Sequence, residues 1–447
     1  MNPYDKPLAQ RRGFMVGAAA GLALPLLAHP AWTQAAVVQP GSTERGVTRV
    51  AGFADAEMDF QLMRQLGATR YGGASVGECL ALAQRIQNGQ PVSWMNEFSA
   101  AAMRQEEDAQ ARARRGHALS ARDQYLVACN NYRAAEYYCG VLDPRHAALG
   151  LKSRECFLAA MLCAPELACE EVVLPFADKL LPAYYFRAPQ AGRRRGKTLI
   201  VISGYDGTLE ETWLAYGRAA LERGYHLLLV TGPGQMDTLR WYPGLAFVPE
   251  YEVVARAALD FLLARRGTDP RRVALMGISY GGYFATRMAA NEPRIRALIA
   301  NSPIVDLHAY MVSFVGFDPA QWPDAEDIRL ADLEHIPDTA IRPQQREMMR
   351  SLMVRMGQGS FKQTYQRLLD FHVSDADLRR IRCPALALVG SGEGQEPQAQ
   401  CARFLSAVAG PVAQHLFTAD EGADGHCQIG NLAYSAAVSM DWLDEVL

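Results

Sequence analysis

The sequence lacks the features by which several large classes of protein are recognised. After its first thirty-five residues, no segment reaches the roughly eighteen consecutive apolar residues of a membrane-spanning helix. Its 45 basic and 48 acidic side chains nearly cancel, and no basic stripe is interleaved with aromatic residues. Internal repeats and low-complexity tracts are absent too. We therefore expect a soluble globular chain with a small-molecule substrate, no nucleic-acid partner and no stable membrane insertion.

Cysteine spacing excludes further kinds of chemistry. The nine cysteines include no C-x-x-C pair and form no Cys/His cluster, so the sequence indicates neither a metal site nor a cofactor. An odd number of cysteines leaves at least one thiol free. We expect most of them to be small core residues. The 447 residues suggest one large domain plus an accessory domain, and they are compatible with a homodimer.

The first thirty-five residues resemble an export signal. A twin arginine, Arg11-Arg12, precedes an apolar run over residues 14–28 that Gly and Pro interrupt, and small residues at 33–35 suit signal cleavage. The run is too short to span a membrane comfortably. We predict a cleaved Tat-type signal over residues 1–35, which implies a periplasmic or secreted protein that was exported in the folded state.

A helical block follows. Apolar residues recur at helical spacing from about residue 54 to 168, and we expect helices over residues 96–115, 120–138 and 153–162. Ser120 is the expected N-cap of the second helix. Residues 36–169 are therefore predicted to form a helical domain, and its place ahead of an α/β half suggests a cap over an active site.

From residue 170 the pattern changes to strands that alternate with helices. A hairpin opens this half, and an insertion over about residues 304–380 is mostly helical. Apolar strands separated by helices indicate a mostly parallel sheet covered on both faces. The strands are expected at residues 171–176, 180–187, 198–203, 225–231, 272–277, 296–300, 384–390 and 412–417. This order predicts an α/β-hydrolase fold over residues 170–447, with a helical lid insertion.

One turn in this half carries a nucleophile pattern. Ser279 lies between Gly277 and Gly281 in a G-x-S-x-G sequence, with an apolar strand before it and a helix after it. Such a nucleophile elbow needs glycines because side chains would clash in the tight turn that exposes the serine hydroxyl. Ser279 is therefore the candidate nucleophile.

The chain order of this fold gives its partners predictable positions. The acid follows a late strand and the base follows the last one. Glu393 occupies the first position, with Glu396 as a competing candidate and Asp306 as a weaker one. Of nine histidines, only His426 follows the last strand. Neutral His426 would take the proton of the attacking serine, while the carboxylate would fix its tautomer.

The remaining site residues are assigned by position. The backbone N–H groups of Tyr280, directly after the nucleophile, and of Tyr205, in the loop after an earlier strand, are expected to bind the oxyanion. The candidate substrate-binding residues are Asp206, Gln235, Arg240, Trp241 and Asp306.

Several motifs together resemble one family. They are SGYDGTLEE (203–211), GPGQ (232–235), GISYGGYFA (277–285), NSPI (301–304) and EGADGHCQ (421–428). In this order they resemble α/β-hydrolases related to 2,6-dihydroxypseudooxynicotine hydrolase and to fungal polyketide-shortening naphthopyrone hydrolases. The resemblance runs from about residue 55 to the end. It implies hydrolysis of esters or of carbon–carbon bonds beside a ketone, with a helical domain over the site and the triad on Ser279, Glu393 and His426.

The sequence thus predicts a cofactor-free serine hydrolase for a bulky, aromatic substrate. An exported acyl-peptidase or dipeptidyl peptidase is the alternative within the same enzyme class. Acyl transfer to an alcohol stays open because water and alcohol compete for the same acyl-enzyme. A non-catalytic binding protein that has kept the fold is the alternative from another class.

Overall fold

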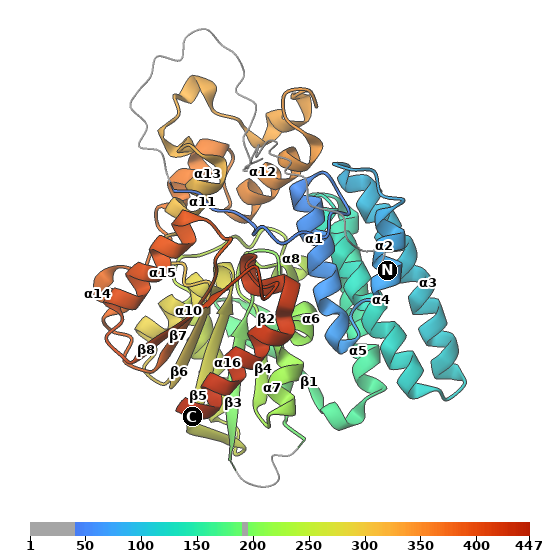
Figure 1. Cartoon of the computed structure of the whole chain (residues 1–447), viewed down its shortest axis with the longest axis vertical. Coiled ribbons are helices and arrows are strands. Elements are labelled where there is room, and N and C mark those ends of the chain that lie inside the picture. Colours follow the sequence, from blue (N-terminus) through green and yellow to red (C-terminus); the bar gives the residue numbers. More distant parts are fainter. Residues whose placement is uncertain (1–40, 190–194) are drawn as a thin grey trace, which may run out of the picture.

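A sheet of eight strands organises the computed structural model, which describes residues 41–189 and 195–447 (Figure 1). The predicted export signal lies outside these residues. The strand order is β1-β2-β4-β3-β5-β6-β7-β8. β2 runs antiparallel to both its neighbours, and all the other pairs are parallel. The strands are β1 (Cys169–Phe176), β2 (Lys179–Phe186), β3 (Gly196–Ile202), β4 (His226–Val230), β5 (Thr268–Ile278), β6 (Ala297–Asn301), β7 (Ala385–Gly390) and β8 (Val412–Phe417).

Alternate residues of the central strands point into two separate cores. In β3, Ile200 and Ile202 belong to one core, while Leu199 and Val201 belong to the other. Helices α9 (Glu252–Leu263), α10 (Tyr280–Asn291) and α15 (Gln395–Ala407) cover the first face, and α6 (Leu209–Thr212), α7 (Arg218–Glu222) and α16 (Leu432–Val446) cover the second. A parallel sheet buried on both faces explains the apolar strands, and the architecture is the predicted α/β-hydrolase fold.

The helical block packs beside this sheet (Figure 1). It consists of α1 (Ala56–Gly67), α2 (Val76–Ala83), α3 (Pro91–Arg114), α4 (Ala118–Tyr138) and α5 (Pro144–Leu162). Phe157 of α5 joins it to the second core, because its ring centroid lies 5.2 Å from that of Tyr184 and 5.5 Å from that of Trp213. The block therefore shares a core with the sheet.

Three helix starts differ from the predictions. α3 begins at Pro91, five residues before the expected start, because proline suits the first turn of a helix. α5 begins nine residues earlier than expected, because Asp143 caps it and Pro144 occupies its first turn. Ser120 is not a cap, since α4 already begins at Ala118. Ala118 and Leu119, both good helix formers, extend this helix ahead of the predicted cap.

The insertion between β6 and β7 supplies α11 (Leu307–Val315), α12 (Pro343–Arg355), α13 (Phe361–Leu368) and α14 (Asp375–Leu378). α11, α12 and α13 gather at one end of the sheet, beside the helical block (Figure 1). All nine cysteines are free thiols, and most are buried as expected. Within the described ranges, no helix is long and apolar enough to cross a membrane.

A buried ion-pair cluster holds the helical block to the hydrolase half. Arg240, in α8 (Met236–Trp241), binds the carboxylate of Glu136 from α4 through two hydrogen bonds of 2.7 and 2.9 Å. The same guanidinium lies 2.8 Å from Asp237 and 3.4 Å from Glu210. The prediction that Arg240 binds substrate is therefore wrong, because its side chain is fully buried and fully used.

We expect Arg240→Met to destabilise the fold by about 3–5 kcal/mol, because it leaves buried carboxylates without their counter-charge. Urea unfolding of the purified protein measures this. Trp241→Ala is the matched control one residue away. The Trp241 side chain is half exposed, so the control should cost less than about 1 kcal/mol. Equal stabilities of the two variants would contradict the structural role of Arg240.

Candidate active site

The elbow after β5 holds Ser279 in a strained backbone conformation, with φ of 60° and ψ of −126°. A residue with a Cβ rarely adopts this region, and such strain is typical of functional positions. The N–H of Ser279 donates to the carbonyl of Asn301 at 2.5 Å. A Cβ on Gly281 would lie 2.5 Å from the carbonyl oxygen of Ile202, and one on Gly277 would collide with the backbone of Gly281. Glycine is therefore required at both positions.

The structure brings His426 and Glu393 to the nucleophile. The Ser279 hydroxyl lies 2.9 Å from Nε2 of His426, and Nδ1 of His426 lies 2.7 Å from the Glu393 carboxylate. Glu393 is fully buried and also accepts hydrogen bonds from Ser302 (2.8 Å) and from the N–H of Gly390 (2.7 Å). Glu396, the competing acid, instead accepts from Gln400 on its own helix. The acid beside the histidine is therefore Glu393.

His426 also contacts a thiol. Sγ of Cys427 lies 3.4 Å from the ring nitrogen that faces Ser279. Burial disfavours the imidazolium, but Cys427 and Glu393 outweigh burial and raise the pKa of His426 to about 10. These contacts therefore favour the imidazolium form of His426 in the free protein.

The loop after β3 lies directly on the elbow. A Cβ on Gly204 would be 2.6 Å from Cβ of Ser279 and 2.8 Å from the backbone nitrogen of Tyr280. Gln235 donates to the carbonyls of Ser203 (2.7 Å) and Gly204 (2.9 Å). Because the C=O and N–H of a trans peptide point in opposite directions, the N–H of Tyr205 points away from Gln235. Tyr280 begins α10, so helix geometry gives its N–H no acceptor.

The inserted helix α12 holds the same loop. Arg355 donates to the carbonyl of Tyr205, and its guanidinium carbon lies 3.8 Å from the centroid of the Tyr205 ring. The Tyr205 hydroxyl lies 2.8 Å from that of Ser351, one turn earlier in α12. Both ends of the Tyr205 side chain and its carbonyl are therefore fixed from outside the loop.

A cavity of about 660 Å³ opens beside Ser279, between the helical block and the insertion. Its wall near the nucleophile is aromatic, and the residues that form it are Tyr205, Tyr280, Tyr310, Phe314, Phe361 and Tyr365. Apolar side chains of α12 extend this wall. The volume is that of a site for a drug-sized molecule.

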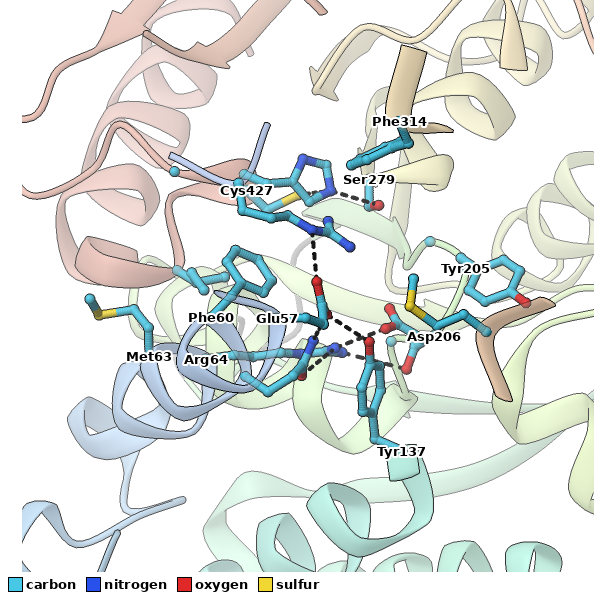
Figure 2. Close-up of a pocket in the computed structure, with 18 of the residues that line it drawn as sticks. Glu57, Phe60, Met63, Arg64, Tyr137, Tyr205, Asp206, Ser279, Phe314 and Cys427 are labelled. Atoms are coloured by element: carbon cyan, nitrogen blue, oxygen red, sulfur yellow. Dashed lines mark hydrogen bonds and ion pairs between the residues drawn. The ribbon is translucent and has the colours of Figure 1, made fainter. Parts of the chain in front are cut away.

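The opposite wall is charged. Figure 2 shows Glu57, Phe60 and Arg64 of α1 facing the side of the cavity that holds Ser279. Tyr137 donates to Glu57 at 2.9 Å, and Arg64 pairs with Asp206 at 3.0 Å. Burial favours the neutral acid, but the guanidiniums of Arg64 and Arg45 lower the pKa of Asp206. The positive and negative side chains on this wall are paired with one another. The wall therefore favours a neutral ligand that carries polar groups over a charged ligand.

Only Asp206 of the predicted substrate-binding residues lines the cavity. Gln235 is buried behind the loop that it binds. Trp241 is half exposed at the end of α8, and Asp306 caps α11 by accepting the N–H of Ala309. None of these three side chains, nor that of Arg240, lines this cavity, because position near a strand end does not fix the direction of a side chain.

Sequence reasoning missed the charged wall. Glu57, Phe60 and Arg64 lie three and four positions apart and therefore share one face of α1. An acidic and a basic residue on the same face of α1 as Phe60 were the available signal. Over residues 41–189 and 195–447, no group of three or more His, Cys, Asp or Glu side chains could hold a metal ion.

Comparisons with known proteins agree with this architecture. Residues 255–358 match the model of the prolyl oligopeptidase family. The chain is 31% identical over 415 residues to the α/β hydrolase xenA of Xenoacremonium sinensis. This alignment covers 87% of this chain and 96% of that protein. It is 32% identical over 361 residues to the α/β hydrolase pydG of an Acremonium species, with 76% and 82% covered. Over 269 residues it is 33% identical to the 20-hydroxy-prefusarin hydrolase of Gibberella moniliformis. That alignment covers 57% of this chain and 62% of that protein.

Solved structures show the same fold. The crystal structure of 2,6-dihydroxy-pseudo-oxynicotine hydrolase superposes with a TM-score of 0.65 at 20% identity, covering 86% of this chain and 95% of that one. AbyA5 superposes with a TM-score of 0.58 at 17% identity, covering 85% and 94%. The fungal relatives and the first of these structures confirm the resemblance inferred from the sequence motifs.

Gly204→Ala should reduce hydrolytic activity by about 10²-fold, because its Cβ would displace the elbow and the Tyr280 N–H. Active-site labelling by a fluorophosphonate should slow in parallel. Gly77→Ala, in α2, is the control, since a Cβ there meets no atom within 4 Å. Equal activity of the Gly204 and Gly77 variants would contradict the placement of this loop at the reacting centre.

Proposed function

Since the chain belongs to the α/β-hydrolase family and is a hydrolase, we propose that it acts as a serine hydrolase through Ser279, His426 and Glu393. The observation that carries the proposal is the continuous hydrogen-bonded chain from the Ser279 hydroxyl through His426 to the buried Glu393. A strained elbow, a base and a buried acid at these distances are the arrangement that activates a serine.

In the proposed reaction, Oγ of Ser279 attacks a substrate carbonyl while Nε2 of His426 takes the serine proton. The N–H groups of Tyr280 and Tyr205 bind the developing oxyanion. His426 then returns the proton to the leaving group as the bond to the carbonyl carbon breaks. Water then attacks the carbonyl of the acyl-enzyme and gives one proton to His426. His426 passes this proton to Oγ of Ser279 as the acyl–oxygen bond breaks, which releases the acid product and restores the free serine.

The proposed substrate is a bulky, aromatic ester or a ketone whose adjacent carbon–carbon bond is cleaved. The aromatic wall beside Ser279 supports a flat apolar group at the reacting end. The compensated charges around Glu57 and Arg64 support polar substituents at the other end. Two relatives carry names of hydrolases that act on 20-hydroxy-prefusarin and 2,6-dihydroxy-pseudo-oxynicotine.

An exported acyl-peptidase is the second candidate, favoured by the match of residues 255–358 to the prolyl oligopeptidase family. Measured turnover separates the two candidates. Cleavage of aminoacyl naphthylamides would support the peptidase, whereas cleavage of aryl esters or aromatic β-diketones would support the ester or carbon–carbon bond hydrolase. Transfer to an alcohol is tested in the same assays by adding methanol and following the methyl ester.

Export, with a periplasmic or secreted location, is likewise a proposal from residues 11–35. Fractionation of cells that produce the full chain tests it.

Fluorophosphonate labelling followed by mass spectrometry tests the nucleophile. We expect the label on Ser279 in the wild type, and none in Ser279→Ala. His426→Ala should react at least ~10²-fold more slowly because the serine has lost its base. Full activity of Ser279→Ala on any substrate that the wild type cleaves would refute the proposed mechanism.

The pH profile should rise into the alkaline range. Imidazolium cannot accept the serine proton, so kcat/KM should increase by about tenfold per pH unit and level off near pH 10, where His426 loses its proton. Cys427→Ala should move this rise to lower pH, because contact with Cys427 raises the pKa of His426. Cys163→Ala, at the C-terminal cap of α5 and remote from His426, should leave the profile unchanged. A profile identical in all three proteins would contradict this role of the thiol.

A further inference from the structure

Residues 42–48, here called the N-terminal strap, cross the loops that carry the acid and the base. The strap precedes α1 and has no helix or strand of its own. The N–H of Glu44 donates to the carbonyl of Glu393 at 2.7 Å, and the carbonyl of Ser42 accepts the N–H of Glu396 at 2.8 Å. The strap is thus bonded to the backbone of the acid itself.

The same strap holds the base loop. The carbonyl of Arg45 accepts the N–H of His426 at 3.3 Å. Gly46 has a φ of 105°, and a Cβ on it would lie 2.5 Å from Cα of Gly425. Only glycine permits this close approach of the two backbones. Acid and base, 33 residues apart in the sequence, are therefore bridged by one short segment from the other end of the described chain.

Asp424 joins all three segments. Its fully buried carboxylate accepts the N–H of Val47 at 2.6 Å, the N–H of Thr48 at 3.4 Å and the Thr48 hydroxyl. Its own carbonyl accepts the N–H of Gly392, next to the acid, at 3.1 Å. Charge-assisted bonds from a carboxylate to backbone N–H groups are strong and geometrically specific.

We propose that the N-terminal strap, anchored by Asp424, positions Glu393 and His426 for catalysis, so that Asp424 is a positioning residue of the active site. The proposal rests on the proposed serine-hydrolase function. Its physical basis is that the acid and base stand on separate loops, while proton transfer from Ser279 requires both to be held to within about 0.5 Å. A shift of about 1 Å can cost 10²-fold in rate without changing the residues that react.

The chain offers a matched control in Asp59. Its carboxylate is also fully buried and accepts the backbone N–H groups of Val50 (3.2 Å), Gly52 (2.7 Å) and Phe53 (3.2 Å). It therefore ties down the chain just after the strap by the same chemistry. However, Asp59 belongs to α1 and its described bonds do not reach the acid or base loops. A purely structural role would give the two aspartates the same consequences.

The experiment compares Asp424→Asn, Thr48→Val and Asp59→Asn in the full chain. We expect Asp424→Asn to lower kcat by about 10- to 100-fold with KM within threefold, and to displace the alkaline rise of the pH profile. Thr48→Val removes one hydroxyl donor and should show a smaller change in the same direction. Asp59 also lines the cavity, so any effect of Asp59→Asn on substrate binding should fall on KM. This variant should lower Tm while leaving kcat and the pH profile within twofold of the wild type.

A proton NMR measurement makes the test independent of turnover. The proton that His426 shares with Glu393 should resonate far downfield, and Asp424→Asn should shift or broaden it while Asp59→Asn should not. Equal losses of kcat in the two aspartate variants, or an unchanged resonance and kcat in Asp424→Asn and Thr48→Val, would overturn the proposal. If Ser279 never labels although the resonance responds to Asp424→Asn, the serine-hydrolase function fails and the positioning role stands.

Discussion

Close approach of backbones at the elbow is the constraint on which the rest of this structure depends. Ser279 is held at positive φ because β5 and α10 meet there without space for side chains at Gly277 and Gly281. The loop after β3 presses on the same point through Gly204. Contacts this close fix Ser279 and the N–H groups of Tyr280 and Tyr205 relative to one another before any substrate arrives, which is the preorganisation that the proposed oxyanion site requires.

The cavity is built by segments that lie far apart in the sequence. Its charged wall comes from α1 and α4, and its aromatic wall comes from the insertion and the elbow. The cluster around Arg240 fixes the charged wall, since it ties α4 to α8 with a buried guanidinium. The helical block therefore has two functions in the architecture: it completes the core on one face of the sheet, and it supplies the polar end of the cavity.

The sequence was sufficient for the fold and for the placement of Ser279, Glu393 and His426. Strand periodicity, local turn chemistry and chain order determine these features, and each can be read within a short window. The predicted substrate-binding residues that do not line the cavity are Gln235, Arg240, Trp241 and Asp306. They share one cause: all were placed by proximity to a strand end, whereas packing between distant segments decides which side chains reach a cavity. The strap was missed because an irregular segment has no period, and its bonds are made by backbone groups that any sequence carries.

The attachment of Tyr205 to α12 has a consequence for how the enzyme opens. The bonds from Arg355 and Ser351 run between the inserted helix and the loop whose N–H would bind the oxyanion. α12 also forms part of the cavity wall, so a displacement of this helix relative to the loop would break the bonds that hold Tyr205. A ligand too large to leave α12 in place would then disturb the proposed oxyanion site, so this attachment couples the size of a bound ligand to the geometry at Ser279.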